Sequence, residues 1–202
     1  MKLYYSPGAC SLCPHIIASE LGIELDLQKT DLATKKLADG SDFRDINPLG
    51  YVPFLVTDNG LELSEVAVIA QYLADMRPEV GLAPPAGSDE RYILMRWLSI
   101  VATEFHKGIS PLFNKDLPEA AREMAALQLE RRLGWLDKQL AGRDYVVGAS
   151  FTIADAYLFT VLRWLPLVKI DRARWKNIDR YHDALRLRPS IVAAMAREGI
   201  RR

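Results

Sequence analysis

The chain has 202 residues, which is long enough for one large domain or two small ones, each with a core of its own. Its 26 lysine and arginine residues balance 26 aspartate and glutamate residues, so no overall field attracts it to nucleic acid or to an anionic membrane. No stretch approaches the roughly 20 apolar residues that span a bilayer, and the segment MKLYYSPGACS lacks the apolar core of a signal peptide, so we expect a cytoplasmic protein with a small or neutral partner.

The first 80 residues alternate between strand-like and helix-like patterns. The apolar spacing predicts a strand at 3–6, a helix at 11–22, a strand at 24–29, a hairpin formed by 52–57 and 61–63, and a helix at 64–76. This order, βαβ followed by ββα, is that of a thioredoxin-like domain, in which helices on both faces of a small mixed sheet bury its strands. We expect this α/β domain to span residues 1–80.

Prolines and glycines concentrate in the stretch RPEVGLAPPAGS, which cannot continue a helix. We therefore place a linker at 81–87 and a second domain at 88–202. The pattern within the second domain predicts helices at 89–113, 118–141, 152–165, 174–187 and 189–198. The predicted fold class is thus an α/β thioredoxin-like N-terminal domain followed by an all-α helical bundle.

The only two cysteines stand three apart in the segment GACSLCPH. Cys10 lies where the first strand meets the first helix, and free N–H groups and the dipole at a helix start stabilise a thiolate. The alternative is a small buried hydrophobic residue, which most unpaired cysteines are. Cys13 lies further into the helix, so we expect it to be the less reactive thiol, although a dithiol redox pair stays open. Zinc would need two more ligands, and His15, His106 and His182 lack metal-ligand spacing with the cysteine pair, so we expect no metal. We interpret His15 and His182 as structural or surface residues.

The predicted helix at 89–113 carries two stripes. The apolar stripe, which we assign to the core, consists of Leu94, Leu98, Val101, Phe105, Ile109 and Leu112. Beside it, Ser99, Thr103, His106 and Ser110 recur at spacings of four, three and four. A small, neutral and titratable stripe next to a buried one is typical of a cleft, whereas a solvated face is usually crowded with lysine and glutamate. Both interpretations remain open.

Three short motifs have complete structural explanations. Ser64 followed by Glu65 suits a helix N-cap with an acidic first turn. Thr152 and Asp155 form a capping-box variant at the start of another helix. The proline of Val52-Pro53 suits the start of a strand, where a missing N–H is tolerated, and the sequence leaves the isomer of this bond open.

Four segments together resemble the cytosolic glutathione transferases, specifically the bacterial beta class: MKLYYSPGACSL, NPLGYVPFL, FHKGISPLFN and SFTIADAYLF. The resemblance covers the whole chain. It implies a thioredoxin-like domain that binds glutathione as a co-substrate, a helical domain that supplies a pocket for the electrophile, and a homodimer.

The resemblance also implies catalytic residues. Cys10 matches the active-site cysteine of the class, and His106 with Lys107 matches its site residues on the helical domain. Tyr5 and Ser11 lie near the tyrosine or serine that activates glutathione in other classes, and they are rival candidates.

Further residues would hold glutathione, again by resemblance. Lys35 would reach a carboxylate of glutathione, and the backbone of Val52 would pair with its cysteinyl part. Glu65 would take the γ-glutamyl amino group, and the N–H of Val66 would hold the neighbouring carboxylate. Relatives usually have a small residue there, so any side-chain hydroxyl contact is lost with valine. Two more positions would face glutathione, across the dimer interface: Ser99 and Thr103.

The leading hypothesis is a transferase that conjugates the thiol of glutathione to hydrophobic electrophiles, in which Cys10 can also form a mixed disulfide with glutathione. A second hypothesis is glutathione-dependent thiol-disulfide exchange, and a third is a ligand-binding protein without useful turnover. The sequence does not name the electrophile. Five aromatic residues could line its pocket or fill the core: Trp97, Phe105, Phe113, Tyr157 and Trp164.

Overall fold

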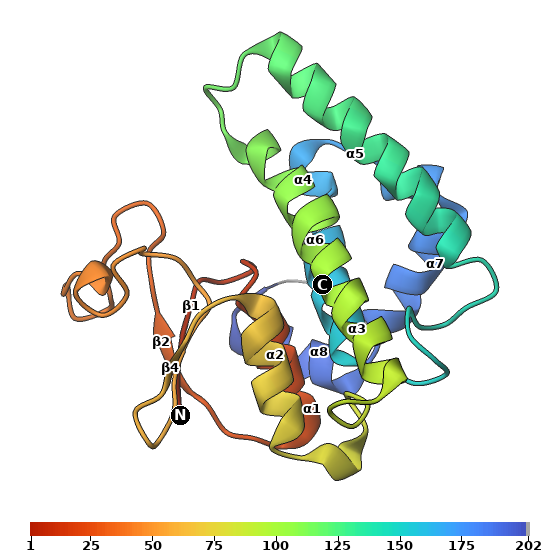
Figure 1. Ribbon diagram of the computed structural model, residues 1–202. Coiled ribbons are helices and arrows are strands. Elements are labelled where there is room, and N and C mark those ends of the chain that lie inside the picture. Colours follow the sequence, from red (N-terminus) through yellow and green to blue (C-terminus); the bar gives the residue numbers. More distant parts are fainter. Residues whose placement is uncertain (201–202) are drawn as a thin grey trace. The chain divides into compact units, whose positions relative to one another are not determined.

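The computed structural model of the chain describes residues 1–200. Contacts within the chain divide it into two compact units, which are Met1–Val80 together with the segment from Pro189, and Gly81–Arg188. Figure 1 labels most of their helices and strands. The predicted fold class, a thioredoxin-like domain followed by a helical domain, is confirmed.

The first unit is built on a four-stranded mixed sheet in the order β2-β1-β3-β4. Its strands are β1 (Lys2–Tyr5), β2 (Asp26–Lys29), β3 (Phe54–Val56) and β4 (Glu62–Leu63). The β1 strand pairs in parallel with β2 and antiparallel with β3, in a register that places Leu3 opposite both Leu27 and Leu55. The parallel pair requires a crossover, and helix α1 (Leu12–Leu21) provides it.

The two sides of this sheet are covered differently. Helices α1 and α2 (Val66–Asp75) pack against each other and lie on the same side of the sheet. A cluster of Tyr4, Phe43, Val52 and Phe54 fills the other side, and Phe43 belongs to a single 3-10 turn. The expectation of helices on both faces was therefore wrong. On this second face, Phe43 of a short 3-10 turn covers Tyr4 and Phe54 of the sheet, where an α-helix was expected.

The last helix, α8 (Pro189–Arg197), packs on α1 and belongs to the first unit. The predicted position of this helix in the domain at 88–202 is wrong, because periodicity shows that a helix has an apolar face but not which partner covers that face. Directly after α8, the buried carboxylate of Glu198 accepts hydrogen bonds from the backbone N–H of Gly8, at 2.9 Å, and from His15 Nδ1, at 3.0 Å. The chain end is thereby tied to the segment that precedes Cys10.

The regular elements of the second unit are all helices. It contains α3 (Asp89–Ile100), a π-helix (Val101–His106), α4 (Lys107–Ile109), α5 (Glu119–Gln139), α6 (Ile153–Leu162) and α7 (Lys176–Leu185), with 3-10 turns between them. Every residue of α6 is buried, so this helix is the centre of the unit's core. The predicted helix at 89–113 is helical along its length, but the sequence analysis did not foresee its π-helical segment.

Polar side chains fix where the central helices begin. Asp155 accepts hydrogen bonds from the N–H and hydroxyl groups of Thr152, both at 2.8 Å, which confirms the predicted capping box. The same carboxylate also accepts from Val146 N and the Tyr181 hydroxyl, so it joins three segments of the core. Burial of Asp155 raises its pKa, and these four hydrogen bonds act in the opposite direction.

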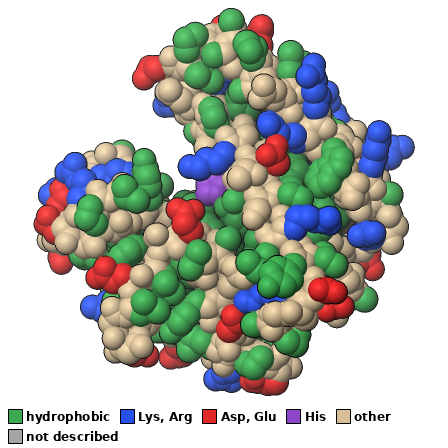
Figure 2. All heavy atoms as spheres, in the orientation of Figure 1, with side chains coloured by type: hydrophobic (Ala, Val, Ile, Leu, Met, Phe, Trp, Pro, Cys, Tyr) green, Lys and Arg blue, Asp and Glu red, His purple; other side chains and the backbone are tan. Residues whose placement is uncertain are grey.

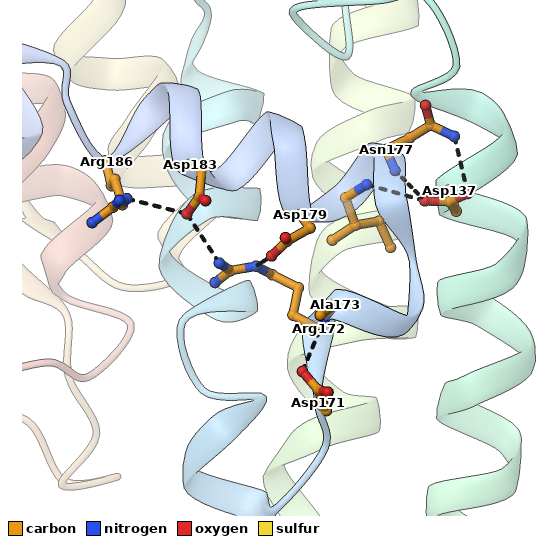
Figure 3. Close-up of polar contacts among 9 residues, drawn as sticks. Asp137, Asp171, Arg172, Ala173, Asn177, Asp179, Asp183 and Arg186 are labelled. Carbon is orange, nitrogen blue, oxygen red and sulfur yellow. Dashed lines mark hydrogen bonds and ion pairs between the residues drawn. The ribbon is translucent and has the colours of Figure 1, made fainter.

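Helix α7 is capped from outside its own sequence. Trp175 at its N-cap makes no side-chain cap bond, and Asp137 of α5 instead accepts from the backbone N–H groups of Asn177, at 2.8 Å, and Ile178, at 3.1 Å. Figure 3 shows this pair of contacts and the neighbouring side chain of Arg172, which bridges Asp179 and Asp183. These bonds hold α7 against α5 and the preceding turn.

Two observations concern membrane spans and surface charge. Across residues 1–200, no helix is long and apolar enough to cross a membrane. Figure 2 shows acidic and basic side chains interspersed with hydrophobic ones over the helical unit, in keeping with a net charge of zero.

Candidate active site

Cys10 lies in the loop between β1 and α1, as predicted. Its side chain is largely buried, with the residue 9% exposed, and Sγ donates a hydrogen bond to the carbonyl oxygen of Val52 at 3.1 Å. The Val52-Pro53 peptide bond is cis. Helix α1 starts two residues after Cys10, so the thiol is close to the N–H groups that a helix start leaves without intrahelical partners. The structure thus brings Cys10 and Val52 together.

Cys13 occupies a different environment from Cys10. Its side chain is fully buried, and neither cysteine forms a disulfide. Burial raises the pKa of Cys13 well above its usual value, and the nearby Cys10 adds to the effect. The second thiol is therefore a core residue that resists forming the thiolate needed for exchange chemistry.

The two rival catalytic candidates, Ser11 and Tyr5, differ in their surroundings. Ser11 Oγ donates to the carbonyl of Ser6 at 3.2 Å and accepts from the Ser6 N–H at 3.1 Å, so its hydroxyl closes the loop. Burial of Tyr5, followed by the charge of Glu198, raises the pKa of the phenol. The Tyr5 phenol therefore stays protonated at neutral pH, and the Ser11 hydroxyl is already used within its own loop.

Lys35 lies beside the segment that leads to Val52. Its backbone has a positive φ of 60°, and Nζ donates to the carbonyl oxygen of Gly50 at 2.9 Å. The ammonium group also lies 5.5 Å from the centre of the Tyr51 ring. A fixed cation therefore flanks residues 50–52 and could attract a carboxylate that binds along this edge.

Glu65 is the N-cap residue of α2, with an unusual positive φ of 65°, so the expectation that Ser64 caps this helix was wrong. The Glu65 side chain makes no cap bond and is exposed, while its carbonyl accepts from the N–H of Val68 and of Ile69. Val66, the first helical residue, has a backbone N–H of the kind that a helix start leaves without an intrahelical partner. A carboxylate and free N–H groups thus coincide at one helix end, which suits a ligand with adjacent amino and carboxylate groups.

His106 belongs to the helical unit and is half-buried against α6. Its Nδ1 lies 2.7 Å from the hydroxyl oxygen of Tyr157, and its ring meets those of Tyr157 and Trp164 edge-on. Burial of His106, followed by the positive charge of Lys107, lowers its pKa from 6.5 to about 4. The imidazole is therefore uncharged at neutral pH, and the exposed Lys107 carries the positive charge beside it.

The predicted polar stripe does not form one face. Thr103 is exposed, and its hydroxyl bonds to the Ser99 carbonyl at 3.0 Å and to Glu104 at 3.2 Å, while the Ser110 hydroxyl bonds to the His106 carbonyl at 2.7 Å. A π-helix has more residues per turn than an α-helix, so the step from Thr103 to His106 turns less than predicted. The hydroxyls of Ser99 and Thr103 consequently lie on a more exposed face than His106.

The predicted site residues are thus distributed over the two units. The first unit holds Cys10, Lys35, Val52, Glu65 and Val66, and the second holds Ser99, Thr103, His106 and Lys107. Of the five aromatic candidates for an electrophile pocket, four are buried, whereas Phe113 is 45% exposed and packs edge-on against Trp164.

Sequence reasoning missed two partners of these residues. Tyr157, which bonds His106, is 51 residues away, and Glu198, which bonds Gly8, is 190 residues away. Neither has a local spacing pattern that could have indicated its partner. No group of three metal-ligating side chains occurs within the part of the chain that the structure describes.

Comparison with known proteins covers the whole chain. The family model for the glutathione S-transferase N-terminal domain matches residues 8–76, and the model for the C-terminal domain matches residues 100–189. The chain is 42% identical to glutathione S-transferase GstA of Escherichia coli O157:H7 over 201 residues, which is 100% of each chain.

Solved structures give the same result. A sphingomonad glutathione S-transferase complexed with glutathione is 43% identical, with a TM-score of 0.95, and the match covers 100% of each chain. A beta-class glutathione S-transferase from Sphingomonas chungbukensis is also 43% identical over 100% of each chain, with a TM-score of 0.96.

Proposed function

Because the chain belongs to the glutathione S-transferase family and uses glutathione as co-substrate, we propose that it joins the thiol of glutathione to small hydrophobic electrophiles at a site that contains Cys10. The observation that carries this proposal is the contact of Cys10 Sγ with the Val52 carbonyl, because it places a thiol at a helix start beside a backbone edge that can pair with a peptide. Glutathione is such a peptide, and its own reactive group is a thiol.

The first unit offers a partner for each end of glutathione. The Val52 backbone pairs with the cysteinyl part, and Lys35 neutralises the glycine carboxylate. The Glu65 carboxylate takes the γ-glutamyl amino group, and the N–H of Val66 at the start of α2 takes the adjacent carboxylate. In this arrangement the sulfur of glutathione comes to Cys10.

The chemical step is nucleophilic attack by sulfur. Glutathione loses its thiol proton to solvent, the thiolate forms a carbon–sulfur bond with the electrophile, and a leaving group departs or the product takes up a proton. We further propose His106 and Lys107 as functional residues of the helical domain, and Ser99 and Thr103 as residues that take part in glutathione binding in a homodimer. Exposed apolar side chains on α3 and α5, among them Tyr92, Ile93 and Trp135, support the dimer.

Thiol-disulfide exchange is the second candidate, and the retained thiol of Cys10 favours it. The Cys10 thiolate would attack oxidised glutathione, form a mixed disulfide and release one glutathione thiolate, and a second glutathione would then regenerate Cys10. Fully buried Cys13, with its raised pKa, argues against an exchange that uses both cysteines. We place the protein in the cytoplasm, where both thiols stay reduced.

One panel of assays separates these functions. Conjugation of glutathione to a nitro-activated aryl chloride, reduction of a small disulfide and reduction of a peroxide are measured on the same preparation of wild type, Cys10→Ala and Cys13→Ser. We expect conjugation in wild type and in Cys13→Ser. After treatment with oxidised glutathione, mass spectrometry should find one glutathione on wild type and none on Cys10→Ala.

Two results would contradict this proposal. The absence of all three activities would indicate a binding protein. Glutathione attached to Cys13 in preference to Cys10, or reductase turnover that is lost in Cys13→Ser, would indicate a dithiol enzyme instead.

A further inference from the structure

Gly50 closes a tight turn directly before the Val52-Pro53 bond. Its N–H donates to the carbonyl of Asn47 at 2.7 Å, and Pro48 occupies the second position of the turn. Asparagine first, proline second and glycine fourth is a residue pattern that β-turns favour. The φ angle of Gly50 is 61°, in the left-handed region that residues with a side chain rarely adopt. The backbone of this turn therefore favours glycine at its last position.

The carbonyl of Gly50 holds the ammonium group of Lys35. Nζ of Lys35 donates to this oxygen at 2.9 Å and lies 5.5 Å from the centre of the Tyr51 ring. The backbone of Lys35 is fixed on both sides, because its N–H donates to the Asp31 carbonyl at 2.8 Å and its own carbonyl accepts from Phe43 N at 2.8 Å. With the backbone fixed, the position of the ammonium group depends on the course of the lysine side chain.

The absence of a side chain at Gly50 leaves room for the stem of Lys35. A Cβ atom at this position would lie 3.3 Å from Lys35 Cδ, 3.5 Å from Lys35 Cε and 3.3 Å from Arg44 Cγ. Carbon atoms in favourable contact are about 3.5–4.0 Å apart, so a methyl group here would crowd both side chains. Asp42 anchors the Arg44 guanidinium with hydrogen bonds at 2.7 Å and 3.0 Å. We therefore expect the Lys35 stem to give way and its ammonium group to leave the carbonyl.

We propose that Gly50 is a positioning residue for Lys35, and that it thereby sets the affinity of the first unit for the carboxylate at the glycine end of glutathione. An ammonium group has three hydrogens, so Lys35 can keep its bond to Gly50 and donate another hydrogen to the ligand. The inference rests on the proposed function for the identity of that ligand. The placement of Lys35 by Gly50 is a property of the first unit alone and can be tested without any ligand.

Lysine labelling tests this placement in the unliganded protein. Brief acetylation followed by peptide mass spectrometry compares half-buried Lys35 with its exposed neighbour Lys36. We expect Lys35 to react more slowly than Lys36 in wild type. In Gly50→Ala, Lys35 should react several times faster than in wild type, because its ammonium group has left the carbonyl, while the rate of Lys36 stays the same. An unchanged Lys35 rate in Gly50→Ala would overturn the proposal.

Two further variants separate the effect of the added side chain from backbone strain. Gly60 also ends a turn, since its N–H donates to the Thr57 carbonyl at 3.0 Å and its φ is 81°, but a Cβ there would have open space within 4 Å among the described residues. Gly60→Ala should therefore lose stability and leave the Lys35 rate unchanged. Gly50→Asn adds a Cβ but tolerates the left-handed backbone better, so it should be more stable than Gly50→Ala and still speed the labelling of Lys35. Equal acceleration in Gly60→Ala, or none in Gly50→Asn, would contradict the placement of Lys35 by Gly50.

Binding measurements then connect the placement to glutathione. In calorimetry, Gly50→Ala should bind glutathione about tenfold more weakly than wild type, as expected for a lost charge-assisted hydrogen bond, and bind the glycine ethyl ester of glutathione within about twofold of wild type. In a Lys35→Ala background, Gly50→Ala should cause no further loss of affinity for glutathione. Equal weakening for both ligands, or losses that multiply, would show that Gly50 does not act through Lys35. Wild type that binds glutathione and the ester equally would instead contradict the proposed contact of Lys35 with glutathione, and the labelling rates would still decide the placement of Lys35 by Gly50.

Discussion

The buried carboxylate of Glu198 should be among the most sensitive positions of the first unit. It ties the residue after α8 to the loop that carries Cys10, through hydrogen bonds from Gly8 N and His15 Nδ1. Its side chain is 0% exposed, so both of its hydrogen bonds are shielded from water in the folded protein. Removal of the acceptor of a buried donor costs about 1–3 kcal/mol. His15 is such a donor, whereas the Gly8 N–H is only partly buried and contributes less, so Glu198→Ala should lower the free energy of unfolding by about 2–3 kcal/mol.

The matched variant Glu198→Gln tests the origin of this cost. Glutamine keeps one carbonyl oxygen and therefore one of the two acceptors, so it should lose about 1–2 kcal/mol. Asp144, an exposed carboxylate paired with Arg180 at 3.0 Å, provides the control, and Asp144→Ala should leave stability nearly unchanged.

Urea unfolding gives the stabilities, and amide hydrogen exchange at Gly8 gives the local effect. We expect the amide of Gly8 to exchange faster in Glu198→Ala than in wild type. Because the loop that carries Cys10 loses its anchor, we also expect the alkylation rate of Cys10 to change. Wild-type stability in Glu198→Ala, or unchanged exchange at Gly8, would refute the reasoning. Equal losses in the alanine and glutamine variants would show that packing, and not the acceptors, is responsible.

Two further predictions concern binding and pH. Lys35→Ala and Glu65→Ala should each weaken glutathione binding by about 1–3 kcal/mol in calorimetry. The control is Lys36→Ala, which alters an exposed neighbour and should leave the affinity unchanged. Unchanged affinity in the first two variants would refute the assignment of Lys35 and Glu65 to the glutathione site. Burial of His182, followed by the charges of nearby arginines, lowers its pKa from 6.5 to about 3. Between pH 6.5 and pH 3 the unfolded chain therefore binds a proton at His182 that the folded protein does not bind. The free energy of unfolding consequently falls as the pH drops below 6.5. His182→Phe removes the titrating group, so the loss of stability between pH 6.5 and pH 4, measured by urea unfolding at both values, should be about 3 kcal/mol smaller than in wild type. The variant should still fold, because the substituted ring can pack on Phe159 as the imidazole does. A pH dependence equal to that of wild type would refute this assignment.

Local signals in the sequence predicted local structure well. The strand at 3–6 and the helix at 64–76 were foreseen from apolar periodicity, and Thr152 with Asp155 was foreseen from a motif that contains its own hydrogen bonds. In each case the residues that form the element also carry the signal. The position of Cys10 at the junction of β1 and α1 was predictable for the same reason.

Features that depend on distant partners were not predictable in this way. The apolar face of α8 indicates a helix, but its packing on α1 depends on a surface almost the whole chain away. The π-helix at Val101–His106 is a second example, because a spacing of four, three and four is read on the assumption of an α-helix. That assumption grouped Thr103 with His106, whereas the structure leaves Thr103 exposed and packs His106 against Tyr157.

The two cysteines show that two different physical causes can support the same prediction. The sequence analysis ranked Cys13 as less reactive because it lies further from the helix start, where the dipole helps a thiolate less. In the structure, Cys13 is only the second residue of α1, so the difference in dipole is small. Full burial instead raises the pKa of Cys13, while Cys10, before the helix, is 9% exposed and donates a hydrogen bond to the Val52 carbonyl. Burial depends on which side of the helix faces the core, and this is where three-dimensional packing decides the chemistry of two residues only three positions apart.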